Sequence, residues 1–251
     1  MLTNAQRKLV ASLADVKGRR RAGLFAAEGT KCVLDTVGTF GLRHLLATPQ
    51  WLAAHPGDYG DAVTEVSREA LCSLSALTLA PDVIAVYALP EPTPFDAAAL
   101  DGRLVLALDR VQDPGNLGTL MRTADWLGVD TVLASTDTVD CYNPKTIQAT
   151  MGAISRVRVV YGDLTDMLGC LGRERVCGTF LDGEDIFGAS LPRDGVLVLG
   201  NEGRGISAAV EAVVVRRLFI PPFPAGRPTS ESLNVASAGA IALAQFRYGK
   251  G

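Results

Sequence analysis

The chain has 251 residues, of which 48% are hydrophobic and 20% charged, a composition typical of a globular protein with a buried core. No stretch approaches the roughly 20 uninterrupted apolar residues that span a bilayer, and the N-terminus lacks a signal-peptide pattern, so we expect a cytoplasmic protein without a membrane partner. The five scattered cysteines include no CxxC pair and predict neither a disulfide framework nor a metal site.

Charge is unevenly distributed along the chain. The formal net charge of −3 is not typical of a nucleic-acid-binding protein, yet residues 1–25 hold six basic side chains and one acid. A local basic cluster can contact a phosphate backbone whatever the net charge is, so we predict RNA binding at this end. The alternative is a solvated charge run in a loop that ends a helix. The predicted RNA-binding residues are Lys17, Arg19, Arg20 and Arg21.

The N-terminal part reads as a small α/β domain. Thr3 and Gln6 have capping-box spacing and predict a helix start, and we expect the basic run 17–23 to end that helix. Short apolar segments then alternate with helix-like stretches. Pro90, Pro92 and Pro94 cannot continue a helix or a central strand, so they predict a linker between domains 1–95 and 96–251. The apolar segments are residues 24–27, 44–47 and 83–88.

From residue 104 onward, short and fully apolar runs are separated by segments of helix length. Such runs suit strands that are covered on both faces, so we predict a parallel, doubly wound α/β domain. Ligands in such sheets bind at the carboxyl ends of the strands, which makes the residues after each run the main functional candidates. The runs are 104–108, 131–135, 175–180, 196–200 and 217–220.

The first candidate segment is 109–128. A Pro114–Gly115 turn is followed by Asn116, which can cap a helix, and by an apolar helical stripe that places Asn116 and Arg122 near the helix start. The alternative is that Asn116 is only a cap and Arg122 only a solvated residue.

The second candidate segment, 196–207, is a strand that runs into a loop with Gly200, Gly203 and Gly205. These glycines let a ligand lie against bare backbone, and Glu202 among them favours a functional site over a purely structural turn. The loop matches neither GxGxxG nor a P-loop, which argues against nucleotide-phosphate binding.

In the third candidate segment, 219–246, a strand ends at Ile220 and a Pro/Gly loop leads to a helix that we expect to start at Ser230 or Ser232. The helix is rich in alanine, serine and glycine, which permits close approach of another backbone within the fold or across a dimer. A capped core helix is the simpler alternative.

Three segments, taken together and in this order, resemble the three motifs of the SpoU branch of the SPOUT superfamily, the RNA ribose 2′-O-methyltransferases. The segments are DPGNLGTLMRTA, LGNEGRGIS and ESLNVASA. The resemblance covers about residues 104–247, and the segment 139–154 is similar to the family's stretch between its first two motifs. AAEGTK at 26–31 is similar to the ribosomal-protein-like RNA-binding domain that precedes the catalytic domain in many members.

The resemblance implies a deep trefoil knot, an S-adenosylmethionine cofactor held largely by backbone groups, and a homodimer that completes the active site. By their match to the motifs, Gly200, Ile220 and Leu233 are the expected cofactor-binding residues. The expected catalytic residues, on the same basis, are Asn116, Arg122, Glu202, Ser232 and Asn234.

The implied reaction is attack of a ribose 2′-oxygen on the sulfonium methyl group. Arg122 is the family's proposed proton acceptor, but a guanidinium is protonated in essentially all proteins, and a bidentate grip on the substrate phosphate is physically easier. The loop 221–232, which includes Arg227, is longer than in many members and can alter substrate access or simply connect.

The resemblance implies ribose methylation of RNA, with rRNA as the expected target, and three other functions compete with this interpretation. One is tRNA 2′-O-methylation, which we rank second because a separate N-terminal domain is commoner in members that resemble rRNA enzymes. Another is a non-catalytic RNA-binding or ribosome-assembly protein of the same fold, against which the retained Asn116, Arg122, Glu202 and Ser232 argue. A nicotinamide-dependent oxidoreductase is disfavoured by the missing GxGxxG pattern.

Overall fold

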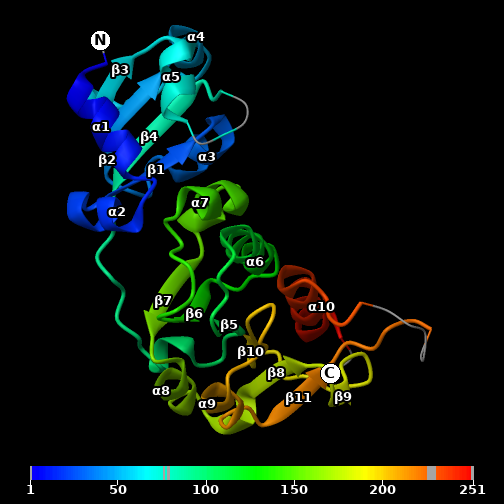
Figure 1. The fold of residues 1–251 in the computed structure, drawn as a ribbon. Coiled ribbons are helices and arrows are strands. Elements are labelled where there is room, and N and C mark those ends of the chain that lie inside the picture. The colour runs from blue at the N-terminus through cyan, green and yellow to red at the C-terminus, as the bar shows by residue number, and fades with distance from the viewer. Residues whose placement is uncertain (1, 76, 78–79, 225–229, 250–251) are drawn as a thin grey trace. The chain divides into compact units, whose positions relative to one another are not determined.

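The computed structural model describes residues 2–75, 77, 80–224 and 230–249, and the chain divides into two compact units (Figure 1). The N-terminal unit comprises Met1–Glu91 and Asp140–Ser155, and the C-terminal unit comprises Pro92–Val139 and Arg156–Gly251. The first of these boundaries falls at the proline-rich linker, whereas Asp140–Ser155 groups with the N-terminal residues and not with its neighbours in sequence. Within the described ranges, no helix is both long and apolar enough to cross a membrane.

The described part of the N-terminal unit contains a four-stranded mixed sheet in the order β1-β4-β2-β3. Strand β4 is antiparallel to both β1 and β2, and β3 is parallel to β2. The strands are β1 (Leu24–Glu28), β2 (Leu42–Ala47), β3 (Val63–Glu65) and β4 (Val83–Ala88). The helices are α1 (Asn4–Ser12), α2 (Val16–Ala22), α3 (Thr30–Thr36), α4 (Pro49–Ala54), α5 (Arg68–Leu74) and α7 (Pro144–Thr150).

The start of α1 is as predicted, because Thr3 and Gln6 form a capping box. The predicted role of the basic run is wrong: residues 17–22 do not form a terminating loop but lie in a second helix, α2, which ends at Gly23 with φ 65°. Glycine adopts this left-handed conformation without strain, and this is why the helix ends there.

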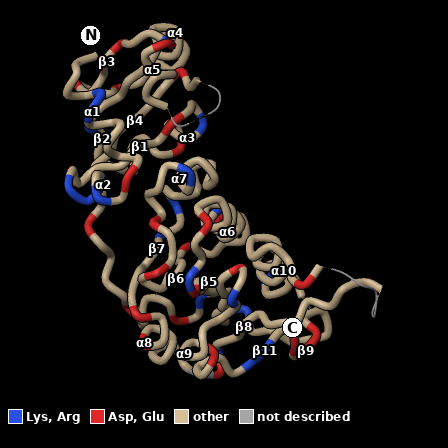
Figure 2. The backbone as a smooth tube through the Cα atoms, in the orientation of Figure 1, with Lys and Arg blue, Asp and Glu red and all other residues tan. Residues whose placement is uncertain are grey.

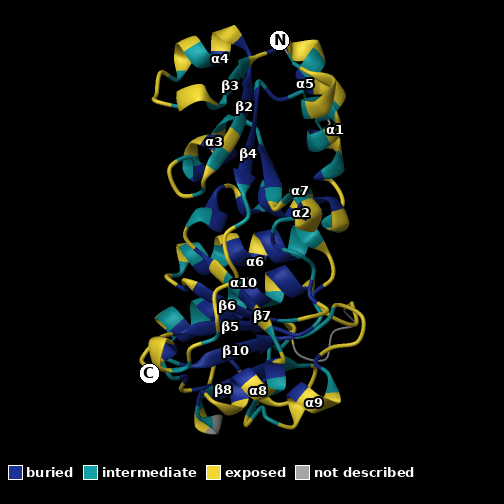
Figure 3. Cartoon of the chain, turned by 90° about the vertical axis from the view of Figure 1, so that its left-hand side faces the viewer, coloured by how far each residue is buried: buried dark blue, intermediate teal, exposed yellow. Residues whose placement is uncertain are grey.

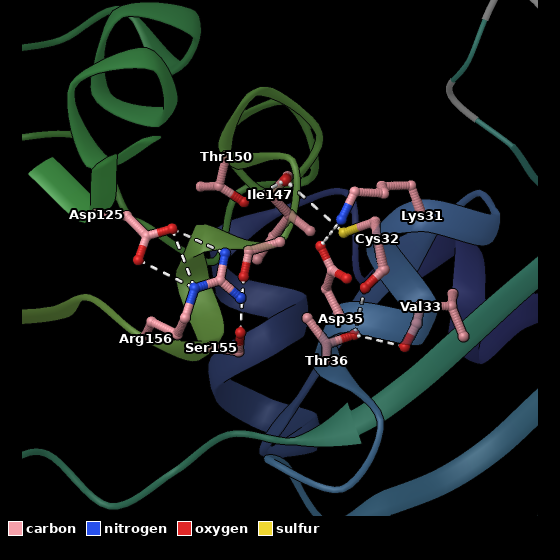
Figure 4. Close-up of polar contacts among 11 residues, drawn as sticks. Lys31, Cys32, Val33, Asp35, Thr36, Asp125, Ile147, Thr150, Ser155 and Arg156 are labelled. Carbon is pink, nitrogen blue, oxygen red and sulfur yellow. Dashed lines mark hydrogen bonds and ion pairs between the residues drawn. The ribbon is translucent and has the colours of Figure 1, made fainter. Parts of the chain in front are cut away.

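Side-chain contacts join the segment 140–155 to the rest of the N-terminal unit. The guanidinium of Arg19 forms an ion pair with Asp140, with Nη2 2.6 Å from Oδ2, and the Tyr142 ring lies 4.8 Å from the Phe25 ring, centroid to centroid. Helix α7 packs against β1, and the Cys32 Sγ lies 3.9 Å from a carbonyl oxygen of α7, that of Ile147 (Figure 4).

The C-terminal unit contains a parallel sheet, seven-stranded over the described residues, in the order β7-β6-β5-β10-β8-β11-β9. This confirms the predicted parallel α/β class. Its central strands are buried (Figure 3). The strands are β5 (Val105–Leu108), β6 (Thr131–Ser135), β7 (Arg158–Gly162), β8 (Val176–Phe180), β9 (Glu184–Asp185), β10 (Val196–Leu199) and β11 (Arg216–Phe219). The α-helices are α6 (Pro114–Trp126), α8 (Leu164–Gly169), α9 (Ala208–Glu211) and α10 (Val235–Tyr248).

The five predicted strands of this unit are all present, and two further strands, β7 and β9, were not predicted. Strand β7 lies at one edge of the sheet and has a single buried residue, Val160, so it has no continuous buried apolar run. Strand β9, at the other edge, has two residues, both exposed. Edge strands are covered on fewer sides, and the criterion of a fully apolar run therefore misses them.

Helix α10 starts later than expected, with Asn234 as the N-cap in place of Ser230 or Ser232. One of its small residues, Gly239, serves packing within the unit. A Cβ on Gly239 would lie 2.4 Å from the Leu120 Cδ2 atom of α6 and 2.8 Å from the Leu199 Cδ1 atom of β10. Helix α10 therefore fits between α6 and β10 because Gly239 has no side chain.

Candidate active site

Helix α6 begins immediately after the loop that follows β5. The N-cap is Asp113, whose Oδ1 accepts a hydrogen bond of 2.8 Å from the backbone N–H of Asn116, so the expectation that Asn116 caps the helix is wrong. Pro114 occupies the first helical turn, where its missing N–H costs no hydrogen bond. Because Asp113 caps the helix, the carboxamide of Asn116 is available for other partners.

The Asn116 carboxamide joins the three motif segments. Its Nδ2 donates to Glu202 Oε1 at 2.8 Å, and its Oδ1 accepts from Asn234 Nδ2 at 2.9 Å. The Oδ1 of Asn234 accepts from the backbone N–H of Ala236 at the start of α10. The orientation of both carboxamides is thus fixed by their partners, and Glu202, Asn116 and Asn234 form one hydrogen-bonded chain, called the Glu202–Asn116–Asn234 chain below.

The turn that carries Glu202 closes on itself. The backbone groups of Asn201 and Gly205 bond to each other at 3.0 and 2.9 Å, and Asn201 Oδ1 accepts from the N–H groups of Gly203 and Arg204. The sequence prediction did not include Asn201. An asparagine two residues before a glycine is the signal for such a turn, since its side chain bonds the backbone two residues on.

Gly200 is required by this turn, because there is no room for a side chain at its position. A Cβ at position 200 would lie 2.3 Å from Gly205 C and Ile206 N, atoms of the turn's own backbone. Gly205 has φ 66°, and a Cβ there would have no heavy atom within 4 Å. The space beside the Gly205 Cα is therefore open, whereas its backbone N–H and carbonyl groups are both bonded to Asn201.

The other two predicted cofactor residues are apolar and accessible. Ile220 directly follows β11 and is half-buried, and Leu233 directly precedes the N-cap of α10 and is 48% exposed.

Two of the predicted catalytic residues do not join the Glu202–Asn116–Asn234 chain. Arg122 is exposed on α6, about 9 Å further along the helix axis than Asn116 at 1.5 Å per residue, and forms no hydrogen bond or ion pair with the described residues. Ser232 is exposed, and its carbonyl oxygen accepts from Ser230 Oγ at 3.2 Å.

The predicted RNA-binding residues separate into two groups. Lys17, Arg20 and Arg21 are exposed on α2, whose basic residues are visible in Figure 2. Arg19 is 2% exposed and bonds to Asp140 and to two backbone carbonyls, so it is occupied within the unit and is not available to a phosphate. Arg227 lies outside the described residues.

A cavity of about 870 Å³ lies in the N-terminal unit, with Thr30, Trp51, His55 and Arg68 among its lining residues. None of the predicted site residues lines it. The volume of a cavity therefore does not identify the active site here. The polar residues at the strand ends of the C-terminal unit are the stronger candidates.

Comparison with known proteins matches residues 103–244 to the model of the SpoU rRNA Methylase family. The 23S rRNA (guanosine(2553)-2′-O)-methyltransferase RlmP of Bacillus subtilis is 31% identical to the chain, over 92% of the chain and 91% of RlmP.

Among solved structures, an RNA methyltransferase described as of the TrmH family, from Porphyromonas gingivalis, matches with a TM-score of 0.87 and 38% identity, over 98% of each chain. An AdoMet-bound rRNA methyltransferase from Sinorhizobium meliloti matches with a TM-score of 0.82 and 29% identity, over 98% of this chain and 95% of the other. The predicted resemblance is confirmed: the chain belongs to the SpoU rRNA methylase family.

Proposed function

We propose that this protein transfers a methyl group from S-adenosylmethionine to a ribose 2′-hydroxyl of ribosomal RNA. The observation that carries the proposal is the Glu202–Asn116–Asn234 chain, which draws the three motif segments together at the carboxyl edge of the parallel sheet. The names of the full-length relatives support rRNA as the substrate class, with tRNA as the second candidate.

The cofactor would be held by the backbone around Gly200 and Gly205 and by apolar contact with Ile220 and Leu233. When bound, S-adenosylmethionine supplies an electrophilic methyl group on a sulfonium. The AdoMet-bound relative from Sinorhizobium meliloti supports this cofactor.

The two carboxamides have unused donors that suit a ribose. Each Asn side chain has two N–H donors, and one of each pair is occupied within the Glu202–Asn116–Asn234 chain. The second N–H of Asn116 and of Asn234 can donate to a ribose oxygen and align the 2′-oxygen with the methyl group. Glu202 fixes this arrangement because it accepts from Asn116.

Arg122 and Ser232 would complete the site from its periphery. A guanidinium stays protonated in proteins, so we assign Arg122 a bidentate grip on the phosphate next to the target ribose, with the phosphate or another group accepting the 2′-hydroxyl proton. Ser232 lies two residues before Asn234 and is exposed, as a group that contacts substrate must be.

RNA would reach the N-terminal unit through Lys17, Arg20 and Arg21, which are exposed on one short helix. We propose a homodimer that buries the outer faces of α6 and α10, where Trp126 is 88% and Tyr248 78% exposed. Single exposed apolar residues are ordinary, but two large rings at the ends of adjacent helices suit an interface.

The C-terminal segment is proposed to form the family's trefoil knot. Supporting this, residues 234–248 return to the first motif, where Asn234 bonds to Asn116 and Gly239 packs on Leu120. The bacterial relative RlmP supports the expectation that the protein is cytoplasmic.

The test is to map 2′-O-methylated nucleotides in total RNA from cells with and without the gene. Loss of one or a few ribose methylations in rRNA supports the proposal, and loss confined to tRNA selects the second candidate. If no methylation changes, calorimetry with S-adenosylhomocysteine and with NAD decides between the remaining candidates. A protein that binds neither is the non-catalytic module, and one that binds NAD is an oxidoreductase.

A further inference from the structure

Arg110 has an unusual backbone conformation at the end of β5. Its φ is 59°, in the left-handed region, where the Cβ of any residue except glycine crowds the following carbonyl oxygen. Such a conformation costs free energy and persists only when the surrounding contacts fix it, and it is enriched at functional sites. The contacts of Arg110 therefore identify what the strained backbone holds in place.

The backbone groups of Arg110 join the ends of three strands. Its N–H donates to Ser135 Oγ, at the end of β6, with a distance of 2.9 Å. Its carbonyl oxygen accepts from Asn201 Nδ2, in the turn after β10, also at 2.9 Å. The first residue of that turn is thus held by the main chain of Arg110.

The side chain of Arg110 reaches the other end of the same turn. Its Nη2 donates to the carbonyl oxygen of Gly205 at 3.4 Å. Its Nε lies 3.4 Å from Asp109 Oδ1, is buried, and has no hydrogen-bond partner among the residues that the structure describes. Asp109 is itself 2% exposed, and its Oδ2 accepts from the N–H of Ser207 at 2.6 Å. Arg110 and Asp109 therefore hold the turn 201–205 at its start, at its end and just beyond it.

Glu202 lies inside this turn and accepts from Asn116 at 2.8 Å. We propose that Arg110 is a positioning residue for methyl transfer, which holds the turn 201–205 so that Glu202 meets Asn116. Glycine would adopt the same backbone conformation without strain, so the arginine is explained by what its side chain does to the turn. The inference rests on the proposed catalytic role of Glu202 and Asn116.

Three variants separate the effect of the strained backbone from the effect of the side chain. Arg110→Gly removes the side chain and relieves the backbone strain, Arg110→Ala removes the side chain and keeps the strain, and Arg110→Lys keeps a cationic donor on a long side chain. Single-turnover methyl transfer is measured with tritiated S-adenosylmethionine, at saturation, on rRNA purified from cells that lack the gene.

We expect Arg110→Gly and Arg110→Ala to lower the rate constant at least about tenfold, or 1.36 kcal/mol. Arg110→Lys should recover part of it. Arg110→Gly should melt no lower than Arg110→Ala, because it is unstrained. A purely structural residue would instead lose activity in proportion to stability, with the glycine variant the more active. Rates equal to wild type in both the alanine and glycine variants overturn the inference.

The decisive measurement is a double-mutant cycle with Glu202→Ala. If Arg110 acts through Glu202, Arg110→Ala has no further effect once the Glu202 side chain is absent, so the double variant matches Glu202→Ala alone. If the fold-losses in rate of the two single variants multiplied in the double variant, Arg110 would not act through Glu202. Wild-type activity of Glu202→Ala would instead reject the proposed catalytic role of Glu202, on which the inference rests. Loss in Glu202→Ala with none in Arg110→Ala rejects Arg110 alone.

Discussion

The side chains of Asn116, Glu202 and Asn234 bond to one another, whereas the Arg122 guanidinium has no hydrogen-bond or ion-pair partner among the residues that the structure describes. An exposed guanidinium on α6 is free to bind a substrate phosphate through two parallel hydrogen bonds. Lysine offers a point charge in place of this planar fork, so it replaces arginine poorly at such a site.

We predict that Arg122→Ala lowers single-turnover methyl transfer by two or more orders of magnitude, at about tenfold per 1.36 kcal/mol, and leaves S-adenosylmethionine affinity and melting temperature near wild type. Arg122→Lys should be intermediate. Arg158→Ala, an exposed arginine on the edge strand β7, is the matched control and should keep full activity. Substantial activity in Arg122→Ala would return Arg122 to an ordinary solvated helix residue.

The cysteines differ in burial, and their thiols should therefore differ in reactivity. Burial raises the pKa of both the Cys32 and the Cys177 thiol to about 11, whereas Cys72 and Cys170 are exposed. The thiolate is the reactive form, so at pH 8 the buried pair is both inaccessible and protonated. We predict that iodoacetamide modifies Cys72 and Cys170 first, as measured by peptide mass spectrometry. Fast labelling of Cys32 or Cys177 in the folded protein would contradict the buried positions.

At the scale of elements, burial explains which parts of the fold the sequence predicts. Strands such as β5 and β10 are buried at every position and read as continuous apolar runs, whereas the edge strand β7 does not. The starts of α6 and α10 differ from the predicted ones by a few residues, because several side chains near each start can cap a helix. Which one does so depends on backbone geometry that composition does not encode.

The site residues also divide into those that the sequence predicts and those that it does not. Motif resemblance named Asn116, Glu202 and Asn234, and the structure brings all three within hydrogen-bond reach. The role of Arg110 depends on contacts with residues about 90 positions away, which no local pattern predicts, whereas Asn201 has a local turn signal in its spacing from Gly203. Arg19 was grouped with its basic neighbours because charge pattern says nothing about which face of a short helix is buried.

Helix α2 therefore combines an interior residue with exposed basic ones, and the two kinds have different expected effects on stability. Arg19→Met would leave the carbonyl of Leu13 and the carboxylate of Asp140 without their partner. Loss of one partner of a buried pair destabilises strongly, but Asp140 is partly exposed, so we predict a loss of about 2–3 kcal/mol. The exposed Lys17→Met should stay within about 0.5 kcal/mol of wild type.

Urea unfolding, followed by the fluorescence of the buried Trp51 in the same unit, measures both variants. Replacing Trp126 with phenylalanine in the background removes the other tryptophan signal. Equal stabilities for Arg19→Met and Lys17→Met would contradict a structural role for the Arg19–Asp140 pair.

At the scale of the whole molecule, self-association is expected through α6 and α10. These helices lie together, since Arg247 near the end of α10 donates to the carbonyls of Leu127 and Gly128 just beyond α6. We predict that Trp126→Asp places a charge in the interface and converts a dimer into a monomer, as measured by sedimentation equilibrium. Phe187→Asp, an exposed aromatic residue elsewhere in the unit, is the control. A wild-type protein that sediments as a monomer would reject the dimer outright.

RNA affinity should depend on the exposed face of α2. Each phosphate neutralised by a basic side chain releases condensed counterions, so log affinity falls linearly with log salt, with a slope of about −0.7 to −0.9 per contact. Because Lys17, Arg20 and Arg21 are exposed, their combined replacement by alanine should reduce the magnitude of the slope by about 2–3 if all three contact phosphate.

The measurement is the binding of fluorescein-labelled rRNA fragments between about 50 and 200 mM salt, the range over which phosphate contacts dominate affinity. Arg158→Ala with Arg193→Ala removes two exposed charges of the C-terminal unit as a control. An unchanged slope in the α2 triple variant, with a reduced slope in the control pair, would move the RNA contact to the C-terminal unit. We expect the reverse, a reduced slope in the α2 triple variant and an unchanged slope in the control pair. That result would explain how a chain with a net charge of −3 binds RNA, because its basic contacts would be concentrated on one helix.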